Sequence, residues 1–184
     1  MKASLRRWPD RWGLAALLVT LLGFSIRVYR LDYQSFHYDE YFSVWLAGHS
    51  LSEILSRLTT NEPHPPLYYS LLHLWLGPAG GGEFAAKFLS LWFSALVNPV
   101  TFRLGRAVAG PGAGLTAALF LTVNPFQFYH AQEARMYSAL ELFTLASNFF
   151  FVRLLHDRRR SDWLGYVSAT TLALASHYET LLLL

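Results

Sequence analysis

The chain has 184 residues, of which 53% are hydrophobic, 16% aromatic and 15% charged. A typical soluble domain is about 45–50% apolar with glycine included and about 25% charged. The composition therefore excludes a disordered chain and a soluble module with a charged surface. Because the sequence has no cysteine, it also excludes a disulfide framework, a thiolate metal site and a cysteine nucleophile.

Five apolar runs predict helices that cross a membrane, since about 20 residues of helix span a bilayer. The runs cover residues 12–31, 84–104, 112–132, 136–155 and 163–184. After the charge-free part of the first run, residues 12–26, Arg27 and Arg30 stand where a signal peptide would have its small-residue cleavage site. We therefore interpret this run as an uncleaved span.

The basic residues predict the orientation of the chain, because cytoplasmic loops of membrane proteins carry an excess of lysine and arginine. They stand before the first run (Lys2, Arg6, Arg7, Arg11), at or just beyond the end of the second (Arg103, Arg106) and at or just beyond the end of the fourth (Arg153, Arg158, Arg159, Arg160). All three groups are cytoplasmic if the N-terminus lies inside and 84–104 crosses inward. The net charge of +3 is then mainly a topology signal, and nucleic-acid binding is only a minor alternative.

The loop 32–83 would face outward, and its pattern predicts short helices along the membrane surface. One amphipathic stretch begins at Asp39-Glu40 and ends at Gly48, and Ser50 or Ser52 could cap a second. The apolar segment 64–77 follows. Its ten helical residues, 67–76, span only about 15 Å, whereas the hydrocarbon core of a bilayer is about 30 Å thick. We interpret it as interfacial or re-entrant, since a full crossing would invert every later loop.

The ionisable residues on the outward side are candidates for chemistry, because charged groups at membrane depth are costly and usually line a polar cavity or pathway. They are Asp39, Glu40, His64, Glu133, Arg135 and His177, with weaker candidates at His37, His130, Glu141 and Glu179. Each also has a structural explanation, as a helix-start acid, a hydrogen-bonded histidine or an interfacial ion pair. Glu133 and Tyr137 are four residues apart and share a helix face.

The two adjacent acids cannot work as a glycosidase-type pair, because neighbours on a helix point about 100° apart. Either one could act alone as a general base or hold a divalent metal. The sequence contains no Walker loop, GxGxxG, GxSxG or HExxH motif. We therefore expect no nucleotide cofactor and no serine-hydrolase chemistry.

Four motifs in order carry a family resemblance: HYDEYFSVWLAG at 37–48, HPPLYYSLLHLWL at 64–76, QEARMYS at 132–138 and SHYETLLLL at 176–184. With their flanking spans they resemble bacterial membrane glycosyltransferases of the GT-C superfamily. The most similar type is the family of dolichyl-phosphate-mannose protein mannosyltransferases and lipid A aminoarabinose transferases. The resemblance implies an all-α, polytopic GT-C transmembrane module in the bacterial plasma membrane, with its active site outside.

The resemblance implies an inverting transfer of a sugar from a polyprenyl-phosphate carrier to a lipid, glycan or protein acceptor. The acid of the first outer loop is the base in this family, which corresponds to Asp39, with Glu40 beside it. Donor binding would involve His64, Lys87, Glu133, Arg135, Tyr137 and His177. A divalent cation such as Mg²⁺ or Mn²⁺ would assist, with Glu40, His64 and Glu133 as candidate ligands.

The sequence departs from the aminoarabinose transferases in two places. Those enzymes have an acid–lysine pair where this chain has Pro63-His64, and an aspartate near the position of Tyr137, so lipid A does not follow as the acceptor. Family members are also several hundred residues long, whereas this chain stops inside an apolar run. We expect the N-terminal part of a larger enzyme, which alone could be inactive.

Two other classes of protein stay open. A transporter or channel subunit would use intramembrane ionisable residues as an ion path, placed near the midplane on broken helices. Here most ionisable residues lie at the outer end of the predicted spans. The helix breaks we expect at Asn98-Pro99 and Asn124-Pro125 are not flanked by acids. A membrane anchor or assembly subunit would need none of the polar clustering.

Overall fold

The computed structural model describes residues 11–60, 64–178 and 180–183, and this part of the chain is entirely helical apart from turns and loops. This confirms the all-α prediction. Several residues used above lie outside the described residues: Lys2, Arg6, Arg7, Pro63 and Glu179.

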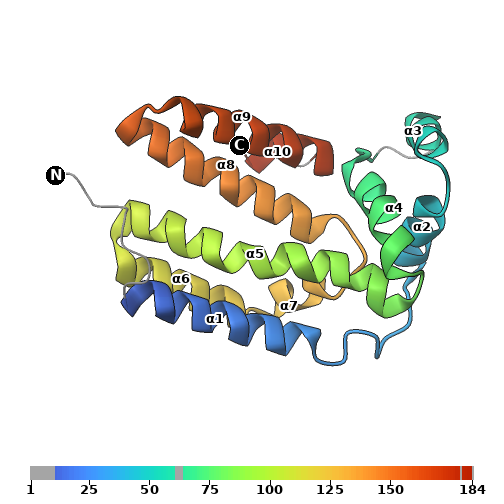
Figure 1. Ribbon diagram of the computed structural model, residues 1–184, viewed down its shortest axis with the longest axis horizontal. Coiled ribbons are helices and arrows are strands. Elements are labelled where there is room, and N and C mark those ends of the chain that lie inside the picture. The colour runs from blue at the N-terminus through green and yellow to red at the C-terminus, as the bar shows by residue number, and fades with distance from the viewer. Residues whose placement is uncertain (1–10, 61–63, 179, 184) are drawn as a thin grey trace.

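Long helices form a bundle around α5 (Glu83–Ala109). Helices α1 (Arg11–Val28) and α6 (Pro111–Val123) pack on one side of α5, and α8 (Tyr137–Asp157) packs on the other, with α9 (Arg160–Ser176) against α8 (Figure 1). Helices α5 and α6 approach closely at Gly114, where an added Cβ would lie 2.8 Å from the backbone nitrogen of Arg106. Small residues allow such close helix contacts in membranes.

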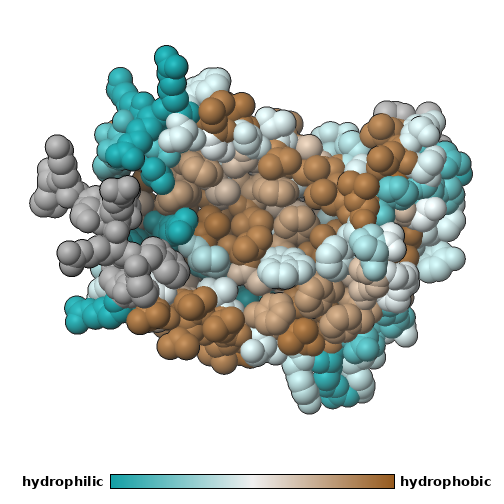
Figure 2. All heavy atoms as spheres, viewed as in Figure 1, coloured by the Kyte–Doolittle hydropathy of each residue, from teal (hydrophilic) through white to brown (hydrophobic). Residues whose placement is uncertain are grey.

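Helix α1 shows the side-chain pattern of a membrane span. Its inward face carries small residues such as Gly13, Ala16 and Gly23, whereas leucines such as Leu18 are exposed. By length and composition, α1 and α8 are long and apolar enough to cross a membrane, and α6 is a shorter apolar helix. In Figure 2 hydrophobic residues cover the middle of the visible face and hydrophilic residues gather toward its ends. The count of five spans stays a prediction.

The two ends of the bundle are built from different elements (Figure 1). The start of α1, the end of α5 and the α8–α9 connection meet at one end, so Arg11, Arg103 and Arg159 lie on the same side. Helices α2 (Tyr38–Ala47), α3 (Leu51–Thr60) and α4 (Leu67–Ala79) gather at the other end. This arrangement agrees with the predicted grouping of the basic residues, although which end faces the cytoplasm stays a prediction.

The three end helices start close to where the sequence predicts. The N–H of His37 donates to Glu40 Oε2 over 3.0 Å at the start of α2. Ser50 and Glu53 hydrogen-bond each other's backbone N–H groups at the start of α3, which is a capping box. Helix α4 has 13 residues, a length of about 20 Å. A buried apolar cluster that includes Leu46, Ile54 and Tyr69 packs these helices together.

The two asparagine–proline pairs behave differently. The predicted span 112–132 is two helices, α6 and α7 (Pro125–Ala131), because Asn124 Oδ1 accepts the N–H groups of Phe126 and Gln127 and starts a new helix. The predicted break at Asn98-Pro99 was wrong, because α5 continues through it. There the Asn98 side chain donates to Thr122 Oγ1 on α6 over 3.0 Å and caps no helix.

The last predicted run is also interrupted. Helix α9 ends at Ser176, His177 is extended, and a short helix α10 (Thr180–Leu183) follows. Thr180 Oγ1 donates over 2.7 Å to the carbonyl oxygen of Ala173, which also accepts the N–H of His177, so α10 is joined to the last turn of α9. The interruption leaves His177 at the end of the bundle that holds α4.

Candidate functional site

The candidate site is built on the turn between α7 and α8, and Glu40 holds this turn against α2. Glu40 is 1% exposed, and its Oε1 accepts the N–H of Ala134 over 2.8 Å. Its Oε2 accepts the N–H of His37, and Lys87 Nζ lies 3.9 Å from Oε1. Since both carboxylate oxygens already have partners, these contacts favour a positioning role for Glu40 over a catalytic one.

Lys87 projects from α5 into the same buried region. Its side chain is 3% exposed, and Nζ donates to the carbonyl oxygen of Gln34 over 2.6 Å. The ammonium also lies 5.7 Å from the centre of the Phe36 ring. Lys87 thus links α5 to the chain before α2, and these contacts favour a structural role over binding of a phosphate.

Asp39 and Arg135 meet at this turn although they are distant in the sequence. Asp39 is exposed on the first turn of α2, whereas Arg135 is 6% exposed. Arg135 Nη1 lies 3.4 Å from the backbone carbonyl oxygen of Asp39 and 3.4 Å from Ser43 Oγ. Burial alone would lower the pKa of Arg135, but Tyr69, Tyr137 and Asp39 more than offset it, so the pKa is raised.

Four rings from four parts of the chain form a row beside Arg135. The ring centre of Tyr137 lies 4.6 Å from that of His130 and 6.2 Å from that of His177, and His177 lies 5.7 Å from His64. The Arg135 guanidinium lies 6.0 Å from the Tyr137 ring. The structure thus brings together His64, Arg135, Tyr137 and His177, and their role in donor binding stays a prediction.

Glu133 joins the row through His130. Its Oε2 lies 2.7 Å from His130 Nδ1, so the carboxylate is paired with an imidazole that the sequence ranked among the weaker candidates. The sequence could have pointed to His130 because it stands three residues before Glu133, a spacing at which two side chains can meet. Glu141 lies further along α8, where it interacts with Arg27.

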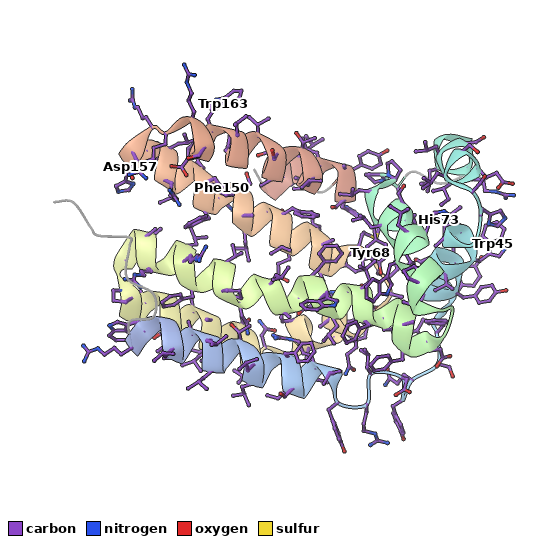
Figure 3. All side chains as sticks on the ribbon, in the orientation of Figure 1. Trp45, Tyr68, His73, Phe150, Asp157 and Trp163 are labelled. Carbon is purple, nitrogen blue, oxygen red and sulfur yellow. The ribbon has the colours of Figure 1, made fainter. Side chains whose placement is uncertain are left out.

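Two buried hydroxyls that the sequence did not single out connect α4 and α5 to the turn. The Tyr68 hydroxyl oxygen on α4 lies 2.8 Å from Ser90 Oγ on α5, and the Ser90 hydroxyl donates to the carbonyl oxygen of Arg135 over 3.0 Å. Figure 3 shows Tyr68 at the junction of α4, α5 and α8. Burial raises the pKa of the Tyr68 hydroxyl, so this group stays neutral and serves as a hydrogen-bonding group. Nothing in the local sequence distinguishes these hydroxyls from other polar residues on apolar helices.

The expected metal ligands do not form a common site. Glu40 is held by two backbone N–H groups and lies beside Lys87, whereas Glu133 is paired with His130, and His64 lies next to His177. Across the described ranges, no three histidine, aspartate or glutamate side chains are grouped to hold a metal ion. The residues therefore do not fit the divalent cation that the resemblance implies.

The geometry places the buried cation of Arg135, on the α7–α8 turn, next to the first turn of α2 with its exposed carboxylate Asp39, and a row of four rings lies beside Arg135. An open groove of about 460 Å³ lies nearby, between the end of α1 and α7, and it is lined by Ser25, Ile26, Tyr29 and Phe128. The carboxylate could accept a proton, the cation could attract an anionic leaving group, and the groove could accommodate an apolar chain.

Comparison with known proteins identifies the family of the chain. The family model described as dolichyl-phosphate-mannose-protein mannosyltransferase matches residues 63–184, which is more than half of the chain. The match includes three of the four motifs but not the segment with Asp39. Neither a curated protein nor a solved structure matches the chain. The chain therefore belongs to the dolichyl-phosphate-mannose-protein mannosyltransferase family, whose members are polytopic membrane glycosyltransferases that use a sugar on a lipid phosphate.

Proposed function

We propose that the protein transfers a sugar from polyprenyl phosphate to an acceptor hydroxyl or amine on the outer face of a bacterial plasma membrane, with inversion at the anomeric carbon. The observation that carries the proposal is the contact between Arg135 and the backbone carbonyl oxygen of Asp39, which places a buried cation beside the first turn of α2, where the Asp39 side chain faces solvent. The N-terminus would lie in the cytoplasm, and the α2–α4 end would face outward.

Asp39 is the general base in this mechanism. An acceptor hydroxyl gives its proton to the Asp39 carboxylate as its oxygen bonds to the anomeric carbon. The bond from that carbon to the phosphate oxygen breaks, and its electron pair leaves with the polyprenyl phosphate. Attack on the face opposite the leaving group inverts the configuration. A positioned general base contributes about 100- to 10,000-fold to such a step.

Arg135 stabilises the departing phosphate. Its guanidinium carries a permanent charge in a region shielded from water, where electrostatic stabilisation of developing charge is strong. Tyr137, His64 and His177 orient the phosphate or the sugar by hydrogen bonds, and the groove beside Tyr29 takes the first part of the polyprenyl chain. Glu40 and Lys87 position α2 and take no part in the proton transfer.

The test is transfer of a labelled sugar from polyprenyl phosphate by the full chain in membranes. We expect Asp39→Asn to lower transfer about 100-fold or more, the range for losing a general base. Asp32→Asn is the matched control, because Asp32 is exposed in the same loop and receives the same substitution. Transfer that is unchanged by Asp39→Asn, or lowered equally by Asp32→Asn, contradicts the role of Asp39.

A further inference from the structure

The break between α6 and α7 leaves a backbone acceptor that needs a donor. In a continuous helix the N–H of residue 125 would donate to the carbonyl oxygen of Leu121. Pro125 has no N–H, and the nearest backbone donor, Asn124 N–H, reaches this oxygen only at 3.4 Å. An unsatisfied carbonyl inside a membrane protein is costly, so breaks of this kind need another group as the donor.

Arg27 supplies that donor from another helix. Its Nη2 donates to the carbonyl oxygen of Leu121 over 2.9 Å, and Arg27 is fully buried near the end of α1. Its positive charge also lies at the C-terminal end of α6, where the helix dipole favours a cation. Within the described residues, Arg27 Nε and Nη1 have no hydrogen-bond partner, so the bond to Leu121 is the main polar contact of the guanidinium.

The neighbouring residues make room for this contact. A Cβ at Gly23 would lie 2.6 Å from Arg27 Nη1 and 2.8 Å from Asn98 Nδ2, so a larger residue there would displace these two side chains from their positions. Glu141 on α8 also interacts electrostatically with the guanidinium. The space at Gly23 lets the Arg27 side chain reach the carbonyl oxygen of Leu121.

A second contact joins the same two segments at the far end of α7. Gln132 Nε2 donates to the carbonyl oxygens of Arg27, over 2.9 Å, and of Tyr29, over 3.2 Å. Arg27 therefore contacts the chain before α7 with its side chain and the chain after α7 with its backbone. Gln132 directly precedes the turn that contains Glu133 and Arg135.

We propose that Arg27 is a positioning residue that replaces the missing N–H of Pro125 and thereby holds α7 and the following turn, with Arg135, in register with Asp39. The effect on catalysis rests on the proposed function, whereas the effect on the position of α7 does not. No contact with substrate is assigned to Arg27.

The experiment is a double-mutant cycle of Arg27→Met and Pro125→Ala in the full chain in membranes. Two quantities are measured: sugar transfer, and the rate at which a thiol reagent labels Ala131→Cys. Ala131 is fully buried in α7 and the chain has no other cysteine, so labelling reports movement of α7. Arg30→Met is the matched control, because Arg30 is exposed three residues away.

We expect Arg27→Met to raise labelling and lower transfer by about 10-fold or more, the effect of losing a hydrogen bond to a charged donor. Pro125→Ala restores a backbone N–H, so the effect of Arg27→Met on labelling should be smaller in that background. Arg27→Lys should retain most of the transfer, because it keeps a cationic donor, whereas Arg30→Met should change neither quantity.

Equal effects of Arg27→Met with and without Pro125→Ala, or no effect on labelling at all, overturn the proposal. If the two substitutions are coupled in the labelling assay but the unsubstituted protein transfers no sugar, the proposed function fails and the role of Arg27 in positioning α7 is supported. If Arg27→Lys loses as much transfer as Arg27→Met while labelling stays low, the positioning role is wrong.

Discussion

Neutralising Glu40 should lower the stability of the protein, whereas neutralising the adjacent Asp39 should leave stability almost unchanged. Glu40→Gln is the most direct test of this difference. The substitution keeps the shape of the side chain but removes the charge that faces Lys87 at 3.9 Å and two backbone N–H groups at 2.8 and 3.0 Å. The amide has one acceptor oxygen, so its NH₂ group must face either an N–H or the ammonium. One donor is then left without a partner in a buried region.

The size of the effect follows from burial. Glu40 and Lys87 have side chains only 2% and 3% exposed, and removing one partner of a buried ion pair typically costs about 3–5 kcal/mol. A lost hydrogen bond to a charged group, about 1.5–3 kcal/mol, is part of that cost and is not added to it. We therefore expect Glu40→Gln to lower the free energy of unfolding by about 3–5 kcal/mol.

The assay is reversible unfolding in mixed micelles, followed by circular dichroism, with Asp39→Asn as the matched control. Asp39 is exposed, so Asp39→Asn should change stability by no more than about 0.5 kcal/mol. Lys87→Met should destabilise as Glu40→Gln does, and the double variant should lose less than the sum, since the second substitution removes the unpaired charge.

Full stability of Glu40→Gln together with loss of sugar transfer would refute this reasoning. That result would return Glu40 to the catalytic role that the sequence resemblance assigned to it beside Asp39. Additive losses in the Glu40→Gln and Lys87→Met pair would show instead that the two side chains do not interact.

Two further predictions concern the bundle and its orientation. Gly114→Val should lower the free energy of unfolding by about 1–3 kcal/mol in the same assay, because the new side chain would push α6 away from α5. Gly112→Val is the control and should cost less, because a side chain at position 112 meets open space. Equal effects of the two substitutions would contradict the close contact. Single cysteines in Tyr38→Cys and Arg159→Cys should react with an impermeant reagent from opposite sides of the membrane, and labelling of both from one side would contradict the proposed topology.

The sequence by itself determined the features that depend on neighbours along the chain. Runs of apolar residues determined where helices form, and capping residues determined where several of them begin, as at Ser50 and Asn124. The same local reasoning failed at Asn98, because a side chain that reaches Thr122 on another helix no longer caps its own. A local pattern predicts structure only where its side chain has no better partner elsewhere in the fold.

The tertiary structure decided which of the candidate residues face solvent and which are enclosed. Asp39 and Glu40 are identical in charge and adjacent in sequence, yet the first faces solvent and the second is buried against Lys87 of α5 and the α7–α8 turn. Arg27 belongs to an apolar run, and its buried guanidinium finds a hydrogen-bond partner at the break before Pro125. Burial and long-range hydrogen bonds depend on residues nearly a hundred positions apart, so one-dimensional spacing cannot determine them.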